Sequence, residues 1–308
     1  MINKLKNQHP GVQFAVFFGL TVAMILVNIV INSVFFPGAA SVLTTNTPTP
    51  QQINSFKWFQ VITTTMIFIM PPLLYGYLSD ERPLQYVGLK PSANFKIFLV
   101  TIVLLVAIQP FAMMVGEINR HANLGETLRK LEDMSEKALA KFLIMDSPAD
   151  LFVNFIVVAL LPAIGEELFF RGSLQNILER WTRRPVVAII LSSAFFALFH
   201  LSVFKFMPIL VLGLALGTLF YMTRNLWYSI FFHFINNSLA LLANYYAQRN
   251  AFMKQLADDE VKLSWIIALA SLLITLALFY YIRKKHPHQP LENTWQRNVF
   301  VNHYNTPS

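Results

Sequence analysis

Residues 151–172 read LFVNFIVVALLPAIGEELFFRG, a long apolar run that ends in two adjacent glutamates and an arginine. A second apolar run, PVVAIILSSAFFALFH, follows at residues 185–200. Apolar runs of about 18 residues or more predict transmembrane helices, and such runs recur along the whole chain. The three charged side chains are therefore predicted to lie within the membrane, where burying a charge costs free energy.

Composition favours a polytopic membrane protein. Of the 308 residues, 55% are hydrophobic and 13% are charged, whereas a soluble domain has about 25% charged residues. The chain has no cysteine, which excludes disulfides, thiolate metal ligands and a cysteine nucleophile. In such a protein the net charge of +8 indicates membrane topology rather than nucleic-acid binding.

The apolar runs predict eight transmembrane helices. No long polar linker separates them, so we assign residues 1–285 to a single transmembrane domain whose motifs lie at 150–240. The first run is too long for a signal peptide, and we interpret it as an uncleaved span. The polar residues 286–308 are predicted to form a disordered cytoplasmic tail. The predicted helices cover residues 12–36, 56–78, 96–117, 150–178, 185–204, 206–222, 226–246 and 263–282.

Basic residues gather at one end of the predicted bundle. The positive-inside rule makes this end cytoplasmic, together with both termini. No retention signal of the K-D-E-L kind is present, so we expect the cytoplasmic membrane of a prokaryote. The loop at 118–149 is an exception, because it has five basic residues. The basic residues at the predicted cytoplasmic end are Lys4, Lys6, Arg82, Lys90, Lys96, Arg180, Arg183, Arg184, Arg224, Arg283, Lys284 and Lys285.

That exceptional loop contains LGETLRKLEDMSEKALAKFLIM, residues 124–145, in which apolar residues recur near helical spacing. We predict an amphipathic helix that lies on the bilayer surface or caps the bundle. An ordinary solvated connecting helix is the alternative. The apolar positions are Leu124, Leu128, Leu131, Ala138, Phe142 and Leu143.

The two glutamates and the arginine have two interpretations. Glu167 and Arg171 are four residues apart, which predicts an ion pair on one helix face. Glu166 lies about 100° around the helix from Glu167 and can contact another group. Gly165 and Gly172 flank the group and allow close helix approach. A purely structural ion-pair cluster is the alternative to a functional site, but a second glutamate would only add desolvation cost to it.

Further polar residues interrupt the later apolar runs. His200 ends FFALFH, and His233 and Asn237 lie four apart in HFINN. A single membrane histidine is more often a hydrogen-bonding group between helices, but two histidines with a glutamate can activate water directly or through a metal. The zincin motif H-E-x-x-H and the serine-hydrolase motif G-x-S-x-G do not occur in the sequence.

Three segments of the chain resemble a known family. EELFFRGSLQNIL (166–178), FFALFH (195–200) and GLALGTLFYMTRNLWYSIFFHFINN (213–237) are similar to the motifs of the CPBP intramembrane proteases, also called the Abi or type II CAAX prenyl endopeptidase family. The family pattern is E-E-x-x-x-R, then F-x-x-x-H, then H-x-x-x-N. The matching polar positions are Glu166, Glu167, Arg171, His200, His233 and Asn237.

The resemblance implies eight membrane helices around a polar cavity. It implies that Glu166 and His200 activate the attacking water, and that His233 and Asn237 stabilise the oxyanion. Glu167 and Arg171 would be the supporting pair. Zn²⁺ bound by Glu166, His200 and His233 and a metal-free mechanism are both open at this point.

The predicted function is therefore an intramembrane endopeptidase acting on membrane-associated proteins or peptides, with CAAX-type prenylated ones as one option. Membrane lipids are expected partners and nucleic acid is not. A non-proteolytic relative that acts as a binding or immunity-type membrane protein is the first alternative. A proton-coupled transporter is the second, although we find no inverted repeats of the kind typical of transporters.

One expectation conflicts with a shared site. At 1.5 Å per residue, His200 lies about 22 Å from a helix start at Pro185, and His233 about 10 Å from a start at Leu226. Straight, upright helices would separate the histidines by about 12 Å in depth. The site requires helix tilt or a later start of the fifth helix.

Overall fold

The computed structural model describes residues 5–43, 45, 47–91, 94–122, 125–258 and 263–285. Within these residues, helices are the regular elements and no strand is present. Seven helices in the described part of the chain are long and apolar enough to cross a membrane. The chain is therefore an all-α polytopic membrane protein, as the sequence predicted. The predicted tail at 286–308 lies outside the described residues, and the single-domain assignment stays a prediction.

Five of the long segments are single helices, and two contain π-helical turns that join shorter helices. The single helices are α1 (Pro10–Phe35), α5 (Phe95–Arg120), α11 (Phe206–Thr223), α12 (Leu226–Ala247) and α14 (Trp265–Lys285). The interrupted segments are α2–α3 (Pro50–Thr64 and Met70–Ser79, joined by Thr65–Ile69) and α7–α8–α9 (Pro148–Asn154, Leu161–Glu167 and Asn176–Thr182, joined by Phe155–Leu160 and Leu168–Gln175). Shorter elements are Leu5–Asn7, Ala39–Leu43, α4 (Pro83–Tyr86), α6 (Glu126–Phe142), α10 (Pro185–Phe199) and α13 (Ala251–Asp258).

The expected fifth span is shorter than predicted. Its helix, α10, ends at Phe199 rather than at residue 204 and has 15 residues. A helix of this length extends about 22 Å, which is less than the hydrocarbon core of a bilayer at about 30 Å. Leu201 follows with a left-handed φ of 52°, and α11 begins at Phe206. The described part of the chain therefore has seven long apolar helices and α10 as a shorter apolar helix, where the sequence predicted about eight spans.

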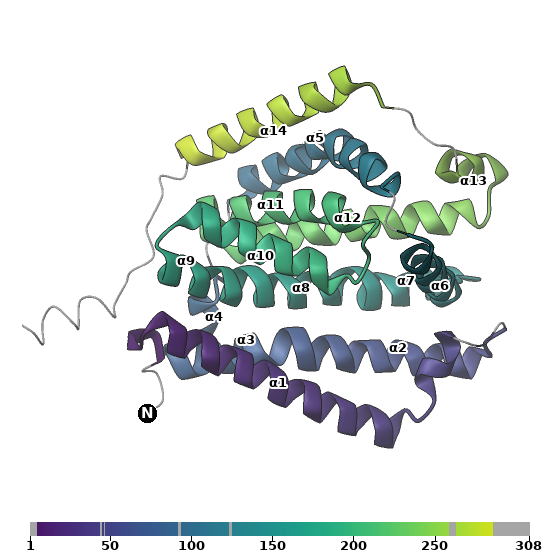
Figure 1. The fold of residues 1–308 in the computed structure, drawn as a ribbon, viewed down its shortest axis with the longest axis horizontal. Helices are drawn as coiled ribbons and strands as arrows, with labels where there is room; N and C mark the ends of the chain where they lie inside the picture. Colours follow the sequence, from purple (N-terminus) through teal and green to yellow (C-terminus); the bar gives the residue numbers. More distant parts are fainter. Residues whose placement is uncertain are drawn as a thin grey trace, which may run out of the picture.

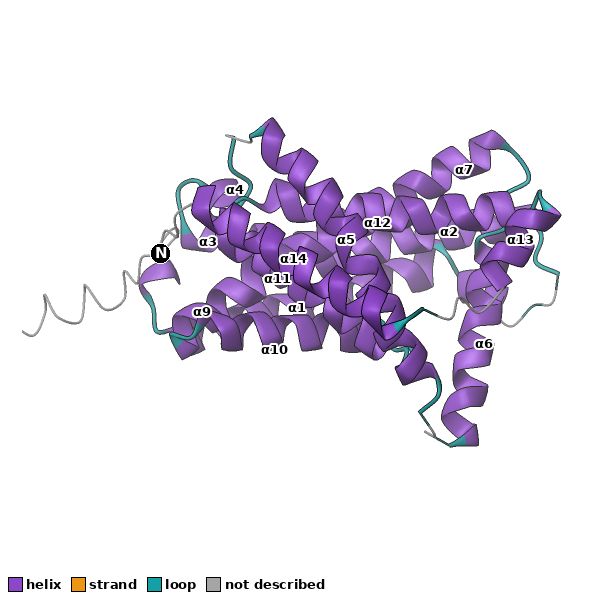
Figure 2. Ribbon diagram, turned by 90° about the horizontal axis from the view of Figure 1, so that it is seen from above, coloured by secondary structure: helices purple, strands orange, loops and turns teal. Residues whose placement is uncertain are grey.

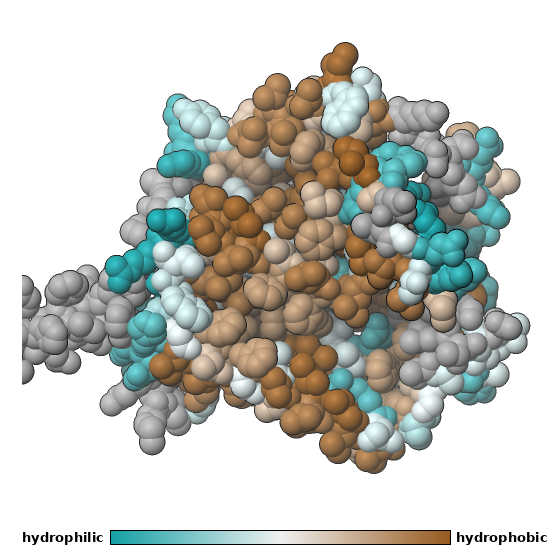
Figure 3. Space-filling view, in the orientation of Figure 1, coloured by the Kyte–Doolittle hydropathy of each residue, from teal (hydrophilic) through white to brown (hydrophobic). Residues whose placement is uncertain are grey.

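The long helices form layers that run in roughly one direction (Figure 1). Helices α1, α2 and α3 form one layer, α8 to α12 form the central part, and α5 with α14 covers the opposite side. Side chains of α5, α11, α12 and α14 share one apolar cluster, and α1, α3, the segment Leu168–Gln175 and α10 share another. Hydrophobic residues cover the middle of the surface in Figure 3, with hydrophilic residues toward both ends. This pattern fits a bilayer that crosses the long helices.

Glycines allow the central helices to pack closely. A Cβ on Gly165 would lie 3.0 Å from Phe68 Cβ, and one on Gly172 would lie 2.5 Å from the carbonyl oxygen of Val87. The close approach predicted around the two glutamates is therefore present. A Cβ on Gly213 would likewise lie 3.1 Å from Ser193 Cβ, so this glycine face also serves helix packing.

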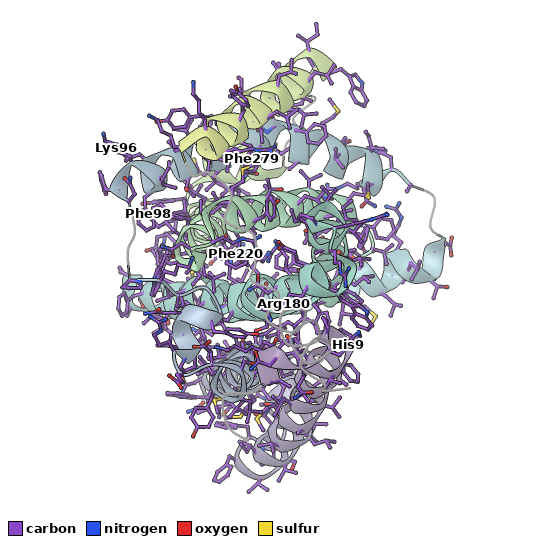
Figure 4. All side chains as sticks on the ribbon, turned by 90° about the vertical axis from the view of Figure 1, so that its left-hand side faces the viewer. His9, Lys96, Phe98, Arg180, Phe220 and Phe279 are labelled. Atoms are coloured by element: carbon purple, nitrogen blue, oxygen red, sulfur yellow. The ribbon has the colours of Figure 1, made fainter. Side chains whose placement is uncertain are left out.

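Lys96 and Arg180, two of the basic residues expected at the cytoplasmic end, lie at one end of the bundle (Figure 4), and Lys4 lies outside the described residues. Figure 4 views this end, where Lys96 and Arg180 are labelled. Arg180 is buried there, and its Nη1 donates to Tyr86 Oη at 2.5 Å and to Gln13 Oε1 at 2.9 Å. The side of the membrane that this end faces stays a prediction.

Helix α6 lies across the opposite end of the bundle. Figure 2 shows it nearly perpendicular to the long helices. Ser202 Oγ donates to Glu132 Oε1 at 2.5 Å, and Lys205 Nζ lies 2.8 Å from Glu136 Oε1. The helix predicted in this loop is present, and it contacts the turn between α10 and α11. Leu124 and the side chains of Ala138 and Phe142 lie outside the described part of the chain.

Candidate active site

The three motifs lie on neighbouring elements. Glu166 and Glu167 end α8, and Arg171 follows in the π-helical segment Leu168–Gln175. His200 caps the C-terminus of α10, and His233 lies on α12 with Asn237 one turn further along. Short π-helical segments inside α-helices are frequent at functional sites.

Glu167 is the centre of a buried polar cluster. Its Oε1 accepts from Arg171 Nη1 at 2.8 Å and lies 3.0 Å from His233 Nδ1. The side chains of Glu167 and Arg171 are both fully buried. Arg171 Nη2 also donates to the carbonyl oxygen of Gly213 at 3.1 Å. The ion pair predicted from the spacing is therefore present, and it connects α8, α11 and α12.

Glu166 approaches the other ring nitrogen of His233. Its Oε2 lies 3.9 Å from His233 Nε2, which is beyond hydrogen-bond distance. This Oε2 is buried and has no hydrogen-bond partner within the described residues. His233 thus lies between two carboxylates, one bonded to Nδ1 and one near Nε2.

Phe196 brings the two histidines together. Its ring centroid lies 4.8 Å from that of His200 and 5.6 Å from that of His233, both edge-on. The Arg171 guanidinium carbon lies 4.3 Å from the same ring centroid. One buried aromatic ring therefore contacts three of the six motif residues.

The depth difference expected for upright helices does not keep the histidines apart, because both line one cavity and both rings contact Phe196, although α10 begins at Pro185 as predicted. His200 Nδ1 lies 2.8 Å from the carbonyl oxygen of Phe196, one turn earlier in α10. This contact folds the ring back along the helix, and it leaves Nε2 without a partner in the described structure. The residue as a whole is exposed.

A cavity of about 70 Å³ lies beside this cluster. It is large enough for ordered water, because one water molecule requires about 10–15 Å³ on this measure. His200, His233 and Asn237 line it, whereas Glu166 and Glu167 are not part of its lining. His233 therefore belongs to both the cavity and the buried cluster. The complete lining is Phe196, His200, Ile209, Leu212, Leu216, Phe232, His233, Asn236 and Asn237.

Comparison with known families identifies this part of the chain. Residues 148–239 match the family model described as "Type II CAAX prenyl endopeptidase Rce1-like". This segment is therefore similar to that family. No curated protein and no solved structure gives a significant match. The matched segment contains all six motif residues, so the family resemblance seen in the sequence is confirmed.

The zinc interpretation requires at least three of the site's side chains to converge on one point. Across the ranges that the structure describes, no group of three or more His, Asp or Glu side chains is placed to hold a metal ion. The set Glu166, His200 and His233 of this Rce1-like segment does not fit a zinc site in this arrangement. We therefore derive no step that involves a metal.

Sequence analysis missed two polar residues at the Rce1-like site. Asn236 lines the cavity, and its Oδ1 accepts from Gln109 Nε2 of α5 at 2.9 Å. Asn119, at the end of α5, holds the turn after His200, because its Nδ2 donates to the carbonyl oxygen of Val203 at 3.0 Å. Both are amides within apolar helices, and that feature could have indicated them.

Proposed function

We propose that this protein is an intramembrane endopeptidase that hydrolyses peptide bonds of membrane-associated proteins or peptides. One observation carries the proposal: two glutamates converge on His233, at a cavity that His200 and Asn237 also line. The match to an endopeptidase family supports the same class of reaction.

His233 stabilises the oxyanion in this mechanism. Its Nδ1–H donates to Glu167, whose charge Arg171 balances. The Nε2–H and the amide of Asn237 then donate to the oxyanion of the tetrahedral intermediate.

Glu166 and His200 activate the hydrolytic water. Glu166 does not line the cavity, but its Oε2 has no hydrogen-bond partner in the described structure and lies 3.9 Å from Nε2 of His233, which does line it, so we assign Glu166 the role of proton acceptor. His200 Nε2 orients the water in the cavity. The water oxygen attacks the carbonyl carbon, the carbon–nitrogen bond breaks, and the proton held by Glu166 passes to the leaving amine.

The cavity favours an apolar substrate segment, because Ile209, Leu212, Leu216 and Phe232 form much of its wall. The family description makes a prenylated CAAX tail the first substrate class to test. We further propose that the protein resides in a prokaryotic cytoplasmic membrane with both termini in the cytoplasm, on the basis of the positive-inside rule.

The test compares wild-type protein with Glu166→Gln in detergent. The probes are a quenched fluorescent farnesylated CAAX peptide and an unprenylated peptide of the same sequence. We expect cleavage by the wild type and none by the variant, because an amide keeps the shape of the carboxylate but is not a base. Glu81→Gln, a change at an exposed glutamate at the basic end, should retain the wild-type rate. Cleavage that persists in Glu166→Gln, or wild type that cleaves neither peptide, would overturn the proposal.

A further inference from the structure

We propose that Asn236 is a substrate-binding residue of this cavity, whose amide NH₂ donates a hydrogen bond to a main-chain carbonyl oxygen of the substrate. The inference rests on the proposed peptidase function. Asn236 follows His233 by three residues and precedes Asn237 directly. Residues at i, i+3 and i+4 share one helix face, and all three side chains line the cavity.

The contact with Gln109 determines which end of the Asn236 amide is available. Gln109 Nε2 donates to Asn236 Oδ1 at 2.9 Å, which occupies the carbonyl end. Asn236 Nδ2 has no partner in the described structure, and it is not among the buried polar atoms that lack one. This nitrogen is therefore not sealed in the interior, and we infer that it faces the cavity, which Asn236 lines.

Helix α14 fixes the segment of α5 that carries Gln109. The next residue is Pro110, which interrupts the hydrogen bonding of α5. Phe111 N donates to Ser271 Oγ of α14 at 3.1 Å, and Ser271 Oγ donates to the carbonyl oxygen of Ala107 at 2.5 Å. The serine hydroxyl thus replaces a helical hydrogen bond at the proline. Gln109 is a positioning residue for Asn236, and its own place is fixed by α5 and by the contact of α5 with α14.

This arrangement selects a particular form of substrate. In the proposed mechanism, His233 and Asn237 serve the carbonyl that is attacked, so Asn236 is available for a second carbonyl. Main-chain carbonyls of a helix are already hydrogen-bonded within the helix. The substrate class is therefore an apolar segment that is extended or unwound where it enters the cavity.

Binding is measured without turnover in a Glu166→Gln background. Fluorescence anisotropy gives the Kd of labelled farnesylated and unprenylated CAAX peptides. Asn236→Asp keeps the acceptor for Gln109 and removes the donor. We expect Kd to rise about tenfold, since the variant loses one hydrogen bond and leaves one substrate carbonyl without a donor. In the active background KM should rise by a similar factor, with a smaller change in kcat.

The matched control is Asn244→Asp. Asn244 lies on the same helix, outside the cavity lining, and its Oδ1 also accepts from a glutamine, Gln248 Nε2, at 2.5 Å. This variant should bind with the wild-type Kd. Gln109→Leu frees the Asn236 amide to rotate, so it should weaken binding less than Asn236→Asp. Added to Asn236→Ala, it should have little further effect, because coupled residues are not additive.

The outcomes separate this inference from the proposed function. Wild type that cleaves neither peptide contradicts the proposed function. If the wild type cleaves, and both Asn236→Asp and Asn236→Ala have the wild-type Kd and KM, the inference alone is contradicted. An equal loss in the Asn236 and Asn244 variants also contradicts it. Melting temperatures in detergent identify a misfolded variant, and Asn236→Ala then replaces Asn236→Asp in the comparison.

Discussion

Glu167 Oε1 lies 3.0 Å from His233 Nδ1 and accepts a hydrogen bond from Arg171 at the same time. This one oxygen of Glu167 in α8 therefore bonds both to Arg171, in the π-helical segment after α8, and to His233 of α12. The geometry resembles a catalytic triad, in which a buried carboxylate fixes the orientation of an imidazole. The same geometry gives the Glu167–Arg171 pair a structural role, so removing the pair should affect folding as well as activity.

Arg171→Ala should lower the stability of the folded protein. It leaves Glu167 fully buried without its cation, and breaking a buried pair in this way costs about 3–5 kcal/mol. The variant should show lower membrane yield and a lower melting temperature in detergent. Arg184→Ala, a change at an exposed arginine at the basic end, is the matched control. Equal yield and melting temperature for the two variants would show that the pair contributes little to stability.

Phe196→Leu should impair activity more than stability. The substitution keeps an apolar side chain of similar size but removes the ring that contacts His200, His233 and Arg171. We expect kcat to fall about tenfold or more, because small misplacements of reacting groups are costly, while the melting temperature changes little. Phe195→Leu alters the exposed neighbour on the same helix and should behave as wild type. A wild-type kcat in Phe196→Leu would remove the positioning role of this ring.

Asn119→Ala should loosen the turn that follows His200. The amide joins the carbonyl oxygen of Val203 at 3.0 Å and the N–H of Met207 at 2.8 Å. Losing both hydrogen bonds costs about 1–3 kcal/mol. Because the turn positions His200, kcat should fall with little change in KM. Asn119→Asp keeps the acceptor for Met207 and should recover part of kcat; no recovery would argue against positioning through the turn.

Hydropathy and spacing were sufficient for much of this fold and site. Long apolar runs have few alternatives to helices in a membrane, so seven spans could be predicted. The pair of Glu167 and Arg171 depends only on local helix geometry, which the sequence contains. Tertiary packing decides the rest. The end of α10 at Phe199 precedes a turn stabilised by Asn119 and by α6, which are distant in the sequence. The contact between Gln109 and Asn236 joins α5 and α12, and no local sequence pattern indicates that these two helices meet.

The ion pair between Lys6 and Asp80 should make stability depend weakly on pH. Burial alone would raise the pKa of the Asp80 carboxyl, but hydrogen bonds from Lys6 and from the N–H of Arg82 outweigh it and lower the pKa below its ordinary value of 3.8. A lowered folded-state pKa contributes stability above the ordinary value, and that stability is lost as pH falls through the folded-state pKa. The pair is partly exposed, so its contribution is at most about 1 kcal/mol.

The measurement compares melting temperatures of wild type and Asp80→Asn in detergent between about pH 6 and about pH 3. Wild type should be slightly more stable at the upper end, and the difference should become smaller toward the lower end. Glu81→Gln, at the exposed neighbouring residue, is the control. A difference that grows on acidification would have the wrong sign for this pair.

The final prediction concerns metal and the two histidines. A catalytic zinc site requires three protein ligands around one ion, and Glu166, His200 and His233 do not form such a group here. We expect purified wild type to contain no stoichiometric zinc and chelator to leave its rate unchanged. If His233 instead donates to the oxyanion, His233→Ala should lower kcat by about two to three orders of magnitude. Asn237→Ala should resemble it, because both would donate to the same oxygen and an amide is a poor zinc ligand. Metal analysis of the wild type and of the His200→Ala, His233→Ala and Asn237→Ala variants decides between the two mechanisms. One tightly bound zinc that is lost in both histidine variants and kept in Asn237→Ala would show that the histidines move to bind metal, and it would replace the oxyanion role of His233.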